Sequence, residues 1–149
     1  MPDVARPNRE AIVAAARGWL GTPYHHQASE RGVGADCIGL VRGVWRDIYG
    51  VDAEQPPAYS RDWAEASGVE TLLAAANRHL APIDPGAIRP GDVIVFRLRP
   101  GLVAKHAAIL VAPQSFVHAM EGAPACEVAL APWRRRRLAG AFAFPGVLN

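Results

Sequence analysis

The sequence predicts an α+β fold, in which helices come first along the chain and an antiparallel sheet follows. Residues 8 to 19 carry apolar side chains at helical spacing, and a second helical pattern runs from Asp36 to about Tyr49. A stretch rich in proline and glycine, APIDPGAIRPGD, then separates the helices from short segments with strand composition. Helices grouped before strands are typical of a layer of helices packed on an antiparallel sheet.

Capping residues predict where three helices begin. Asn8 is a suitable N-cap for the first helix, which is expected to end at Gly21, and Asp36 is a suitable N-cap for the second. Ser67 and Glu70 form a capping box ahead of LLAAANRHL, which predicts a third helix. The apolar stripe of the first helix comprises Ile12, Val13, Ala16, Trp19 and Leu20.

Short apolar segments in the second half of the chain are expected to form the sheet. These segments are DVIVFRL, HAAILV, SFVHAM, CEVAL and AFAF. Their spacing is that of a meander, in which consecutive strands pair. The 149 residues, half of them hydrophobic, fit one domain over 1–149 whose core needs no disulfide or metal.

Composition argues against several classes of protein. The net charge is only +2 and Lys105 is the single lysine, so the sequence offers no broad basic surface for nucleic acid. No apolar run is long enough to span a membrane, and the polar start, MPDVARPNRE, is unlike a signal peptide. We therefore expect synthesis in the cytoplasm, where Cys37 and Cys126 stay reduced.

The loop GTPYHHQASERGVGA, between the first two helices, is long and polar in the way of loops that build sites. Tyr24 is a candidate donor to an oxyanion. His25 and His26 are candidates for lining a substrate groove. Each has a structural interpretation as well, because the tyrosine can pack the loop and paired histidines in a polar loop are commonly just exposed.

Cys37 is the candidate nucleophile. With Asp36 as N-cap it takes the first position of a helix, where the positive helix end, together with a nearby imidazolium, favours the thiolate. One helical stripe holds Cys37, Val41, Val44 and Ile48, and it directs the thiol toward the sheet. A lone cysteine is more often a buried structural residue, so the interpretation needs a base on a strand nearby.

His106, at the start of HAAILV, is the candidate base, and His118 on the next strand is the candidate for orienting it. A three-residue turn between these strands would place both histidines on one face as diagonal neighbours. An even-numbered turn would put them on opposite faces, and Glu121 or Gln114 would then have to orient the base. Either histidine taken singly is more often structural.

Other polar residues favour ordinary roles. The run Arg134 to Arg137 can contact an anionic polymer or a partner protein, although a solvated strand edge is the more common role. His25 and His26 do not have the spacing of a zinc site with His79 or Cys126, so no metal is expected.

Four segments in order, LGTPYHH, GADCIGLVRGVW, KHAAILV and SFVHAM, resemble the NlpC/P60 cell-wall peptidases. The longer segments GTPYHHQAS and GLVRGVWR resemble those of the small stand-alone members encoded among the tail genes of phages and gene transfer agents. The resemblance implies a papain-like fold, with Cys37 as nucleophile, His106 as base and His118 as the third, orienting residue. No cofactor is required.

The resemblance also implies hydrolysis of an amide in the stem peptides of peptidoglycan, commonly the one between D-glutamate and diaminopimelate. Carriage on a phage-like particle, with tail-tip or hub proteins as partners, would bring the enzyme to the periplasm and cell wall. Many relatives have a serine after the catalytic cysteine that, with the tyrosine and the aspartate, helps receive a free peptide amine. Ile38 takes this place beside Tyr24 and Asp36, which favours an intact wall as the substrate.

Two other functions stay open at this point. One is a non-catalytic component of a tail tip, which grips the wall or neighbouring tail proteins. The other is an amidase or acyltransferase on the same cysteine and histidines, acting on wall peptides in the cytosol.

Overall fold

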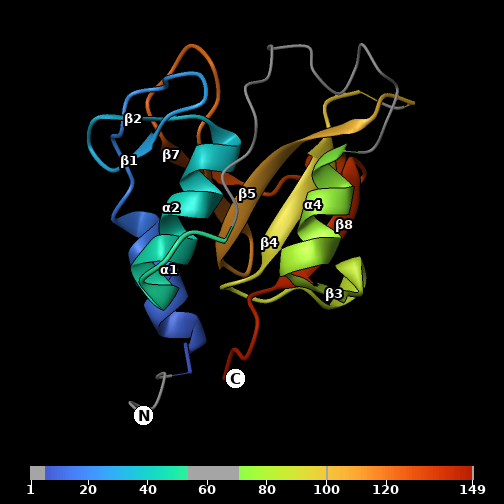
Figure 1. Ribbon diagram of the computed structural model, residues 1–149. Helices are drawn as coiled ribbons and strands as arrows, with labels where there is room; N and C mark the ends of the chain where they lie inside the picture. The colour runs from blue at the N-terminus through green and yellow to red at the C-terminus, as the bar shows by residue number, and fades with distance from the viewer. Residues whose placement is uncertain (1–5, 54–70, 100, 149) are drawn as a thin grey trace.

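The computed structural model describes residues 6–53, 71–99 and 101–148, and it has the predicted order of helices before the main sheet (Figure 1). The helices are α1 (Arg9–Arg17), α2 (Cys37–Tyr49), α4 (Thr71–His79) and α5 (Pro132–Arg135), with a 3-10 turn η1 (Pro85–Ala87). The strands are β1 (Ser29–Glu30), β2 (Gly34–Ala35), β3 (Ala81–Ile83), β4 (Val93–Arg97), β5 (Ala104–Ala112), β6 (Ser115–His118), β7 (Cys126–Ala129) and β8 (Leu138–Ala143). The α+β fold class is therefore confirmed.

The first helix begins where its N-cap predicted and ends sooner than expected. The side chain of Asn8 accepts a hydrogen bond from the Ala11 amide at 2.7 Å. The helix stops at Arg17 with Gly18 as C-cap, so the predicted end at Gly21 is wrong. Leu20 then lies outside the helix and is 41% exposed, although the predicted stripe included it.

The main sheet contains all five predicted strands and one more. Its strand order is β3-β8-β4-β5-β6-β7, and every neighbouring pair is antiparallel. The predicted meander holds from β4 to β7 and is wrong for β8, which pairs with β4 and not with β7. The additional strand, β3, lies inside the stretch that was predicted to be only a boundary. The third helix is present as α4, whereas its predicted capping box, Ser67 and Glu70, lies outside the described residues.

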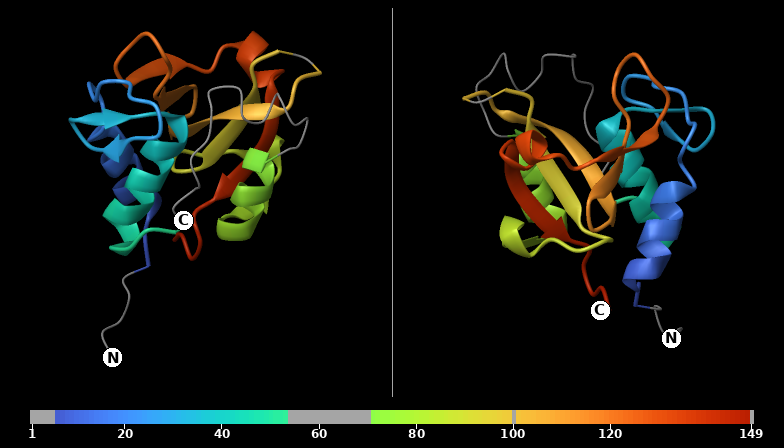
Figure 2. Two further views of the ribbon diagram at one scale, coloured as in Figure 1. Left: turned by 45° about the horizontal axis from the view of Figure 1, so that its top comes forward. Right: turned by 180° about the vertical axis from the view of Figure 1, so that it is seen from behind.

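Two apolar layers cover the two faces of the sheet. Helices α1, α2 and α4 pack on one face, where Ile12, Leu40 and Leu72 join side chains from β4 and β5 in a buried cluster (Figure 1). A second cluster, around Phe96 and Phe116, fills the other face. The chain crosses that side from β7 to β8 through α5, as the view from behind shows (Figure 2).

Helix α2 packs closely against the chain that follows α1. Gly43 lies on the side of α2 that faces Trp19, and a Cβ atom built on Gly43 would come within 1.9 Å of the indole ring. The indole is 1% exposed, and its Nε1 donates a hydrogen bond to Asp47 on the same helix at 2.9 Å. The glycine is therefore required by close approach, and it helps to fix the position of α2.

We predict that Gly43→Ala destabilises the protein by about 1–3 kcal/mol, since overpacking a buried contact forces side chains or backbone to move. Urea denaturation followed by circular dichroism measures the effect. Gly86→Ala is the matched control, because its Cβ atom would meet nothing closer than 3.4 Å. Equal stability of the two variants would contradict the close contact.

Candidate active site

The buried carboxylate of Asp36 holds the site loop against the start of α2. One oxygen accepts a hydrogen bond from the Gly39 amide at 2.7 Å, as the N-cap prediction required, and the other accepts one from the Gln27 amide at 2.8 Å. Asp36 is 4% exposed. Gly39 allows the loop to approach this closely, because a Cβ atom there would lie 1.8 Å from the carbonyl oxygen of Ala28.

Cys37, the first residue of α2, lies against the start of β5. Its sulfur interacts with the backbone of the residues immediately before and after His106. Its Sγ donates a hydrogen bond to the carbonyl oxygen of Lys105 at 3.8 Å. The Ala107 amide interacts favourably with the ionised sulfur, as do the amides of Ile38 and Cys37 itself. The thiol is half-buried and not paired with Cys126. The thiol therefore lies beside the strand segment that carries His106.

His106 and His118 lie on the same face of the sheet, and the turn that joins their strands is not the one predicted. Pro113 and Gln114 form a two-residue turn, since Ala112 pairs with Ser115. The register then shifts between Leu110 and Ala112, which is the signature of a β-bulge at the skipped residue. The bulge compensates for the even-numbered turn and restores the register that keeps the two histidines together.

The two imidazoles form a buried hydrogen-bonded pair. Nε2 of His106 lies 2.9 Å from Nδ1 of His118, and the rings meet edge to face with centroids 5.1 Å apart. The residues are 7% and 5% exposed. This bond occupies one ring nitrogen of His106 and leaves Nδ1 for another partner. His118, and neither Glu121 nor Gln114, therefore forms this hydrogen bond to His106.

Burial keeps the thiol and both imidazoles uncharged. Loss of solvation, followed by the repulsion that a charged His106 would meet from a charged His118 and from Arg134, lowers the pKa of His106 from 6.5 to about 3. Burial and Arg134 lower the pKa of His118 to about 4. Burial also raises the pKa of the Cys37 thiol to about 11, and the Asp36 charge adds to the rise. The predicted thiolate is therefore wrong for the resting site, because these effects outweigh the backbone amides.

A cleft of about 170 Å³ opens beside Cys37 and His106. Of the residues that the sequence singled out, it is lined by Tyr24, His26, Asp36, Cys37, Ile38 and His106. His118 lies behind His106 and does not reach the cleft. His25 is exposed and is not among the residues that line this cleft, which agrees with the structural interpretation of the pair and not with groove lining.

The cleft also contains residues that the sequence did not indicate. These are Leu98, Lys105, Ala119 and Met120, together with Glu121, which was considered only for orienting the base. Lys105 lies at a second irregularity, where Phe96 pairs with His106 but Arg97 pairs with Ala104. A bulge of this kind turns the extra side chain out of strict alternation, so consecutive residues of β5 both face the cleft. The sequence did contain one signal for Lys105, because it is the only lysine and directly precedes His106.

Comparison with known proteins identifies the family. The family model described as "NlpC/P60 family" matches residues 21–139, which include the whole cleft. The chain belongs to the NlpC/P60 family. No curated protein matches the sequence significantly.

Solved NlpC/P60 structures share this fold at low sequence identity. The NlpC/p60 domain of the peptidoglycan hydrolase SagA is 22% identical, with a TM-score of 0.67 over 92% of this chain and 99% of that one. An NlpC/P60 family protein from Bacillus cereus is 19% identical, with a TM-score of 0.69 over 95% of this chain and 42% of its own. The peptidoglycan hydrolase RipB from Mycobacterium tuberculosis is 17% identical, with a TM-score of 0.60 over 91% and 63%. These likenesses support the papain-like NlpC/P60 architecture.

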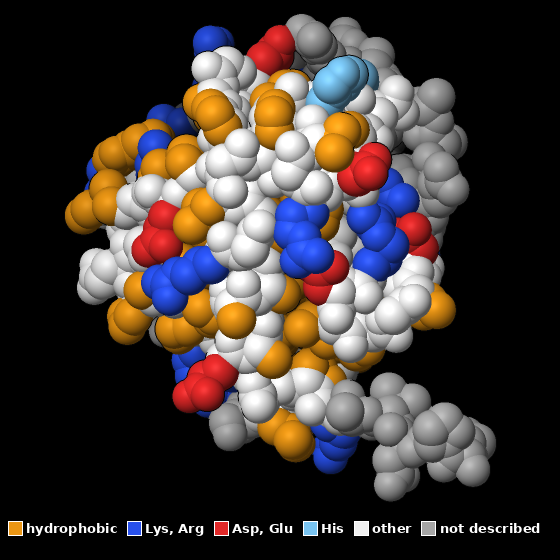
Figure 3. All heavy atoms as spheres, turned by 90° about the vertical axis from the view of Figure 1, so that its left-hand side faces the viewer, with side chains coloured by type: hydrophobic (Ala, Val, Ile, Leu, Met, Phe, Trp, Pro, Cys, Tyr) orange, Lys and Arg blue, Asp and Glu red, His pale blue; other side chains and the backbone are white. Residues whose placement is uncertain are grey.

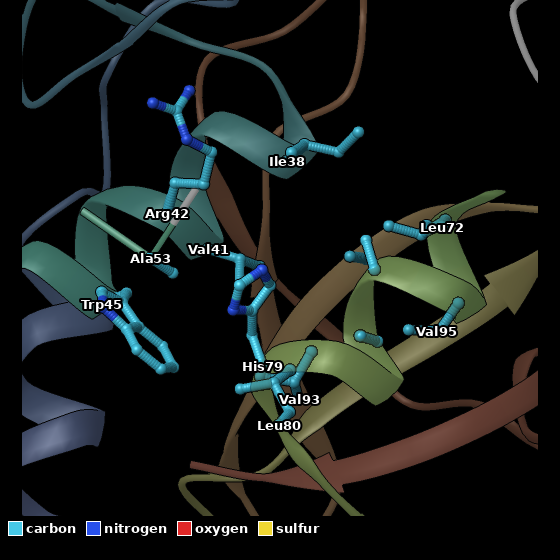
Figure 4. A pocket seen from close by; sticks show the side chains of 13 residues that line it. Ile38, Val41, Arg42, Trp45, Ala53, Leu72, His79, Leu80, Val93 and Val95 are labelled. Atoms are coloured by element: carbon cyan, nitrogen blue, oxygen red, sulfur yellow. The ribbon is translucent and has the colours of Figure 1, made fainter. Parts of the chain in front are cut away.

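A second pocket, of about 110 Å³, lies between α2 and α4 over strands β4 and β5 (Figure 4). It is largely apolar, with Val41, Trp45, Leu72, Val93 and Val95 among its walls. Ile38 lines both this pocket and the cleft, and it packs against the core cluster. The residue that follows Cys37 therefore contributes to apolar packing between the two.

The surface over α1, α2 and the site loop carries charges of both signs (Figure 3). Arg31 lies 3.8 Å from Asp47, and Arg42 and Arg46 each lie 3.3 Å from Asp52. Cations and anions are therefore interspersed and paired on this face. Within the described residues, no helix is both long and apolar enough to cross a bilayer.

The buried histidines predict an acid-sensitive fold. The unfolded chain binds protons at histidine near pH 6.5, whereas the folded protein resists protonation of His118 and His106 until about pH 4 and 3. The free energy of unfolding therefore has its full value above pH 6.5 and decreases as the pH falls toward 4. Urea denaturation across this range measures the slope, which we expect to be shallower in His118→Asn.

The exposed His25 provides the control for this slope. His25→Asn is expected to leave the pH dependence unchanged. A slope in His118→Asn equal to that of the wild type would contradict burial of a neutral imidazole pair.

Proposed function

We propose that the protein is a cysteine peptidase that cleaves amide bonds in the stem peptides of peptidoglycan. Cys37 is the nucleophile, His106 is the base, and His118 orients the base. The observation that carries the proposal is the position of the Cys37 sulfur beside the β5 segment that bears His106, whose ring is fixed from behind by His118. A nucleophile, a base and an orienting group in one chain is the arrangement that this chemistry needs.

In the proposed reaction the site starts with a neutral thiol and a neutral imidazole. When substrate excludes water, Nδ1 of His106 takes the proton from Sγ while the sulfur forms a bond to the scissile carbonyl carbon. The amide of Cys37 and the hydroxyl of Tyr24 stabilise the oxyanion, each donor contributing a factor of about a hundred or more in rate. His106 then returns the proton to the leaving amine. Water activated by His106 hydrolyses the thioester.

Peptidoglycan is proposed as the substrate because two similar solved structures, SagA and RipB, are described as peptidoglycan hydrolases. The cleft holds Lys105 together with the carboxylates of Asp36 and Glu121, and Lys105 is the group that fits the bond between D-glutamate and diaminopimelate. Both residues carry carboxylates, and Lys105 presents a cation next to His106. An ammonium group attracts such carboxylates without imposing one geometry.

We further propose delivery on a phage-like or gene transfer agent tail, where tail-tip or hub proteins are the partners. The segments GTPYHHQAS and GLVRGVWR support this assignment, because they resemble those of tail-associated members of the family. Ile38 supports an intact wall as the substrate, since its side chain is apolar at the cleft and packs against the core. It offers no group that binds a free peptide amine.

We predict that Cys37→Ala abolishes release of soluble peptides from purified peptidoglycan, since it removes the nucleophile and leaves the hydrogen bonds of Asp36 intact. Cys126→Ala is the matched control and is expected to retain activity. Mass spectrometry of the products identifies the bond. Equal release by wild type and Cys37→Ala would contradict the proposed chemistry, and no release by either would favour a protein that binds the wall without cutting it.

We also predict that Lys105→Met raises KM for stem peptides with free carboxylates by about tenfold, which corresponds to one charged hydrogen bond of about 1.5 kcal/mol. Peptides amidated at the D-glutamate and diaminopimelate carboxyls are the comparison. The difference between acidic and amidated peptides is expected in wild type and lost in the variant. A preference that survives Lys105→Met would show that another group reads the carboxylate.

A further inference from the structure

The four consecutive arginines after Trp133 have different surroundings. Arg135 and Arg136 are exposed. Arg137 lies over the Trp133 ring at 5.8 Å and donates a hydrogen bond to the carbonyl oxygen of Leu98. Arg134 is half-buried and turns toward the sheet, so the arginine run is not a uniform solvated edge.

Arg134 lies over the aromatic ring that packs against His118. Its guanidinium carbon is 5.5 Å from the centroid of Phe116 and 4.7 Å from the Trp133 ring. Phe116 has no exposed surface and meets His118 edge to face, with centroids 5.1 Å apart and an interplanar angle of 90°. A single buried ring therefore separates this cation from the orienting histidine.

The electrostatic effect of Arg134 reaches both imidazoles. After burial, it is the remaining cause of the lowered pKa of His118, and it also lowers the pKa of His106. Solvent screens it only in part, because the intervening Phe116 ring is apolar and buried while Arg134 itself is half-buried.

Other titratable or charged groups surround the pair from the cleft and the neighbouring strand. Cys126 of β7 lies directly opposite His118 in the sheet. The cleft brings Cys37, His26, Asp36, Lys105 and Glu121 to the His106 side. Arg134, unlike these groups, lowers the pKa of both histidines. The carboxylate of Asp36 is already occupied by two amides.

We propose that Arg134 is a positioning residue, which acts through Phe116 to disfavour the charged form of His118, so that His118 goes on accepting the hydrogen bond from His106 at lower pH. A protonated His118 can only donate from Nδ1. Nε2 of His106 would then have to accept, which would place the remaining ring proton on Nδ1, the atom that must take the proton of Cys37. The consequence for catalysis rests on the proposed function, whereas the protonation of His118 does not.

Arg134 also affects the later proton transfer. When His106 takes the thiol proton it becomes a cation close to a second, fixed cation. The repulsion favours passing the proton to the leaving amine instead of keeping it on the ring. The arginine thus helps the base step only through His118, which leaves Nδ1 of His106 free to accept a proton, whereas its direct repulsion weakens His106 as a base and strengthens it as an acid.

The test measures the protonation of the rings directly and needs no substrate. Nuclear magnetic resonance titration of ring-labelled histidines, assigned with His106→Asn and His118→Asn, gives the pKa of each ring in the full chain. We expect Arg134→Gln to raise the pKa of His118 by about one pH unit, the size expected for a nearby charge that solvent screens only in part. Arg134→Lys keeps the charge and is expected to titrate like the wild type.

Arg135→Gln is the matched control, because it removes the same charge from an exposed neighbour in the same run. Arg134→Met is a second charge-free variant, which keeps an apolar stem over Phe116 if the glutamine variant does not fold. Unchanged histidine titration in a folded Arg134→Gln or Arg134→Met variant, or an equal change in Arg135→Gln, would overturn the proposal.

Activity separates this proposal from the proposed function. The low-pH limb of the kcat/KM profile is expected to move to higher pH in Arg134→Gln and to stay in place in Arg135→Gln. Raised histidine pKa values in a protein that cleaves no peptidoglycan would support the role of Arg134 and reject the peptidase. If the wild type cleaves peptidoglycan but the histidine pKa values are the same with and without Arg134, the result would support the peptidase and reject this role.

Discussion

The geometry of the cleft depends on one buried carboxylate. Asp36 bonds to both pieces of chain that form this part of the cleft, since one oxygen caps the helix that begins with Cys37 and the other holds the loop that carries Tyr24 and His26. Ser29 of the same loop adds a hydrogen bond to the carbonyl oxygen of Gly39 at 2.6 Å. Buried carboxylates are stable only when their oxygens are hydrogen-bonded, so the loop and the helix start must form together. The nucleophile and one wall of the cleft are therefore fixed by the same side chain.

The opposite wall is built from the irregular parts of the sheet. A regular antiparallel ladder would send alternate side chains of β5 to opposite faces. The irregularity beside Lys105 relaxes that alternation at the cleft, while the one near Val111 sets the register of β6. The two histidines are enclosed in apolar side chains, so both imidazoles stay neutral until a reaction places a proton on one of them.

The sequence predicted the fold class, the start of both N-terminal helices and all five main strands, but it left the shared face of the two histidines dependent on the turn and did not predict the bulge that brings it about. Those features depend on local patterns, such as caps at Asn8 and Asp36 and apolar periodicity. It did not predict the charge state of Cys37, since burial depends on what packs around the sulfur. It also did not distinguish His26, which lines the cleft, from the exposed His25, and it left Lys105 out, because turns and bulges decide where such side chains lie.

The bulge near Val111 has a consequence for how this hairpin can vary in length. The residue that the register skips contributes to the number of residues between the histidines without contributing to the pairing. A deletion there would give a regular hairpin with one residue fewer, and both imidazoles would still face the same side. An insertion or deletion elsewhere in the hairpin would turn one of them over, unless a new bulge absorbed it. Spacing between the two histidines is therefore a weaker guide to a working pair than the pairing of their strands, and a related chain with one residue fewer between them can still keep both on one side.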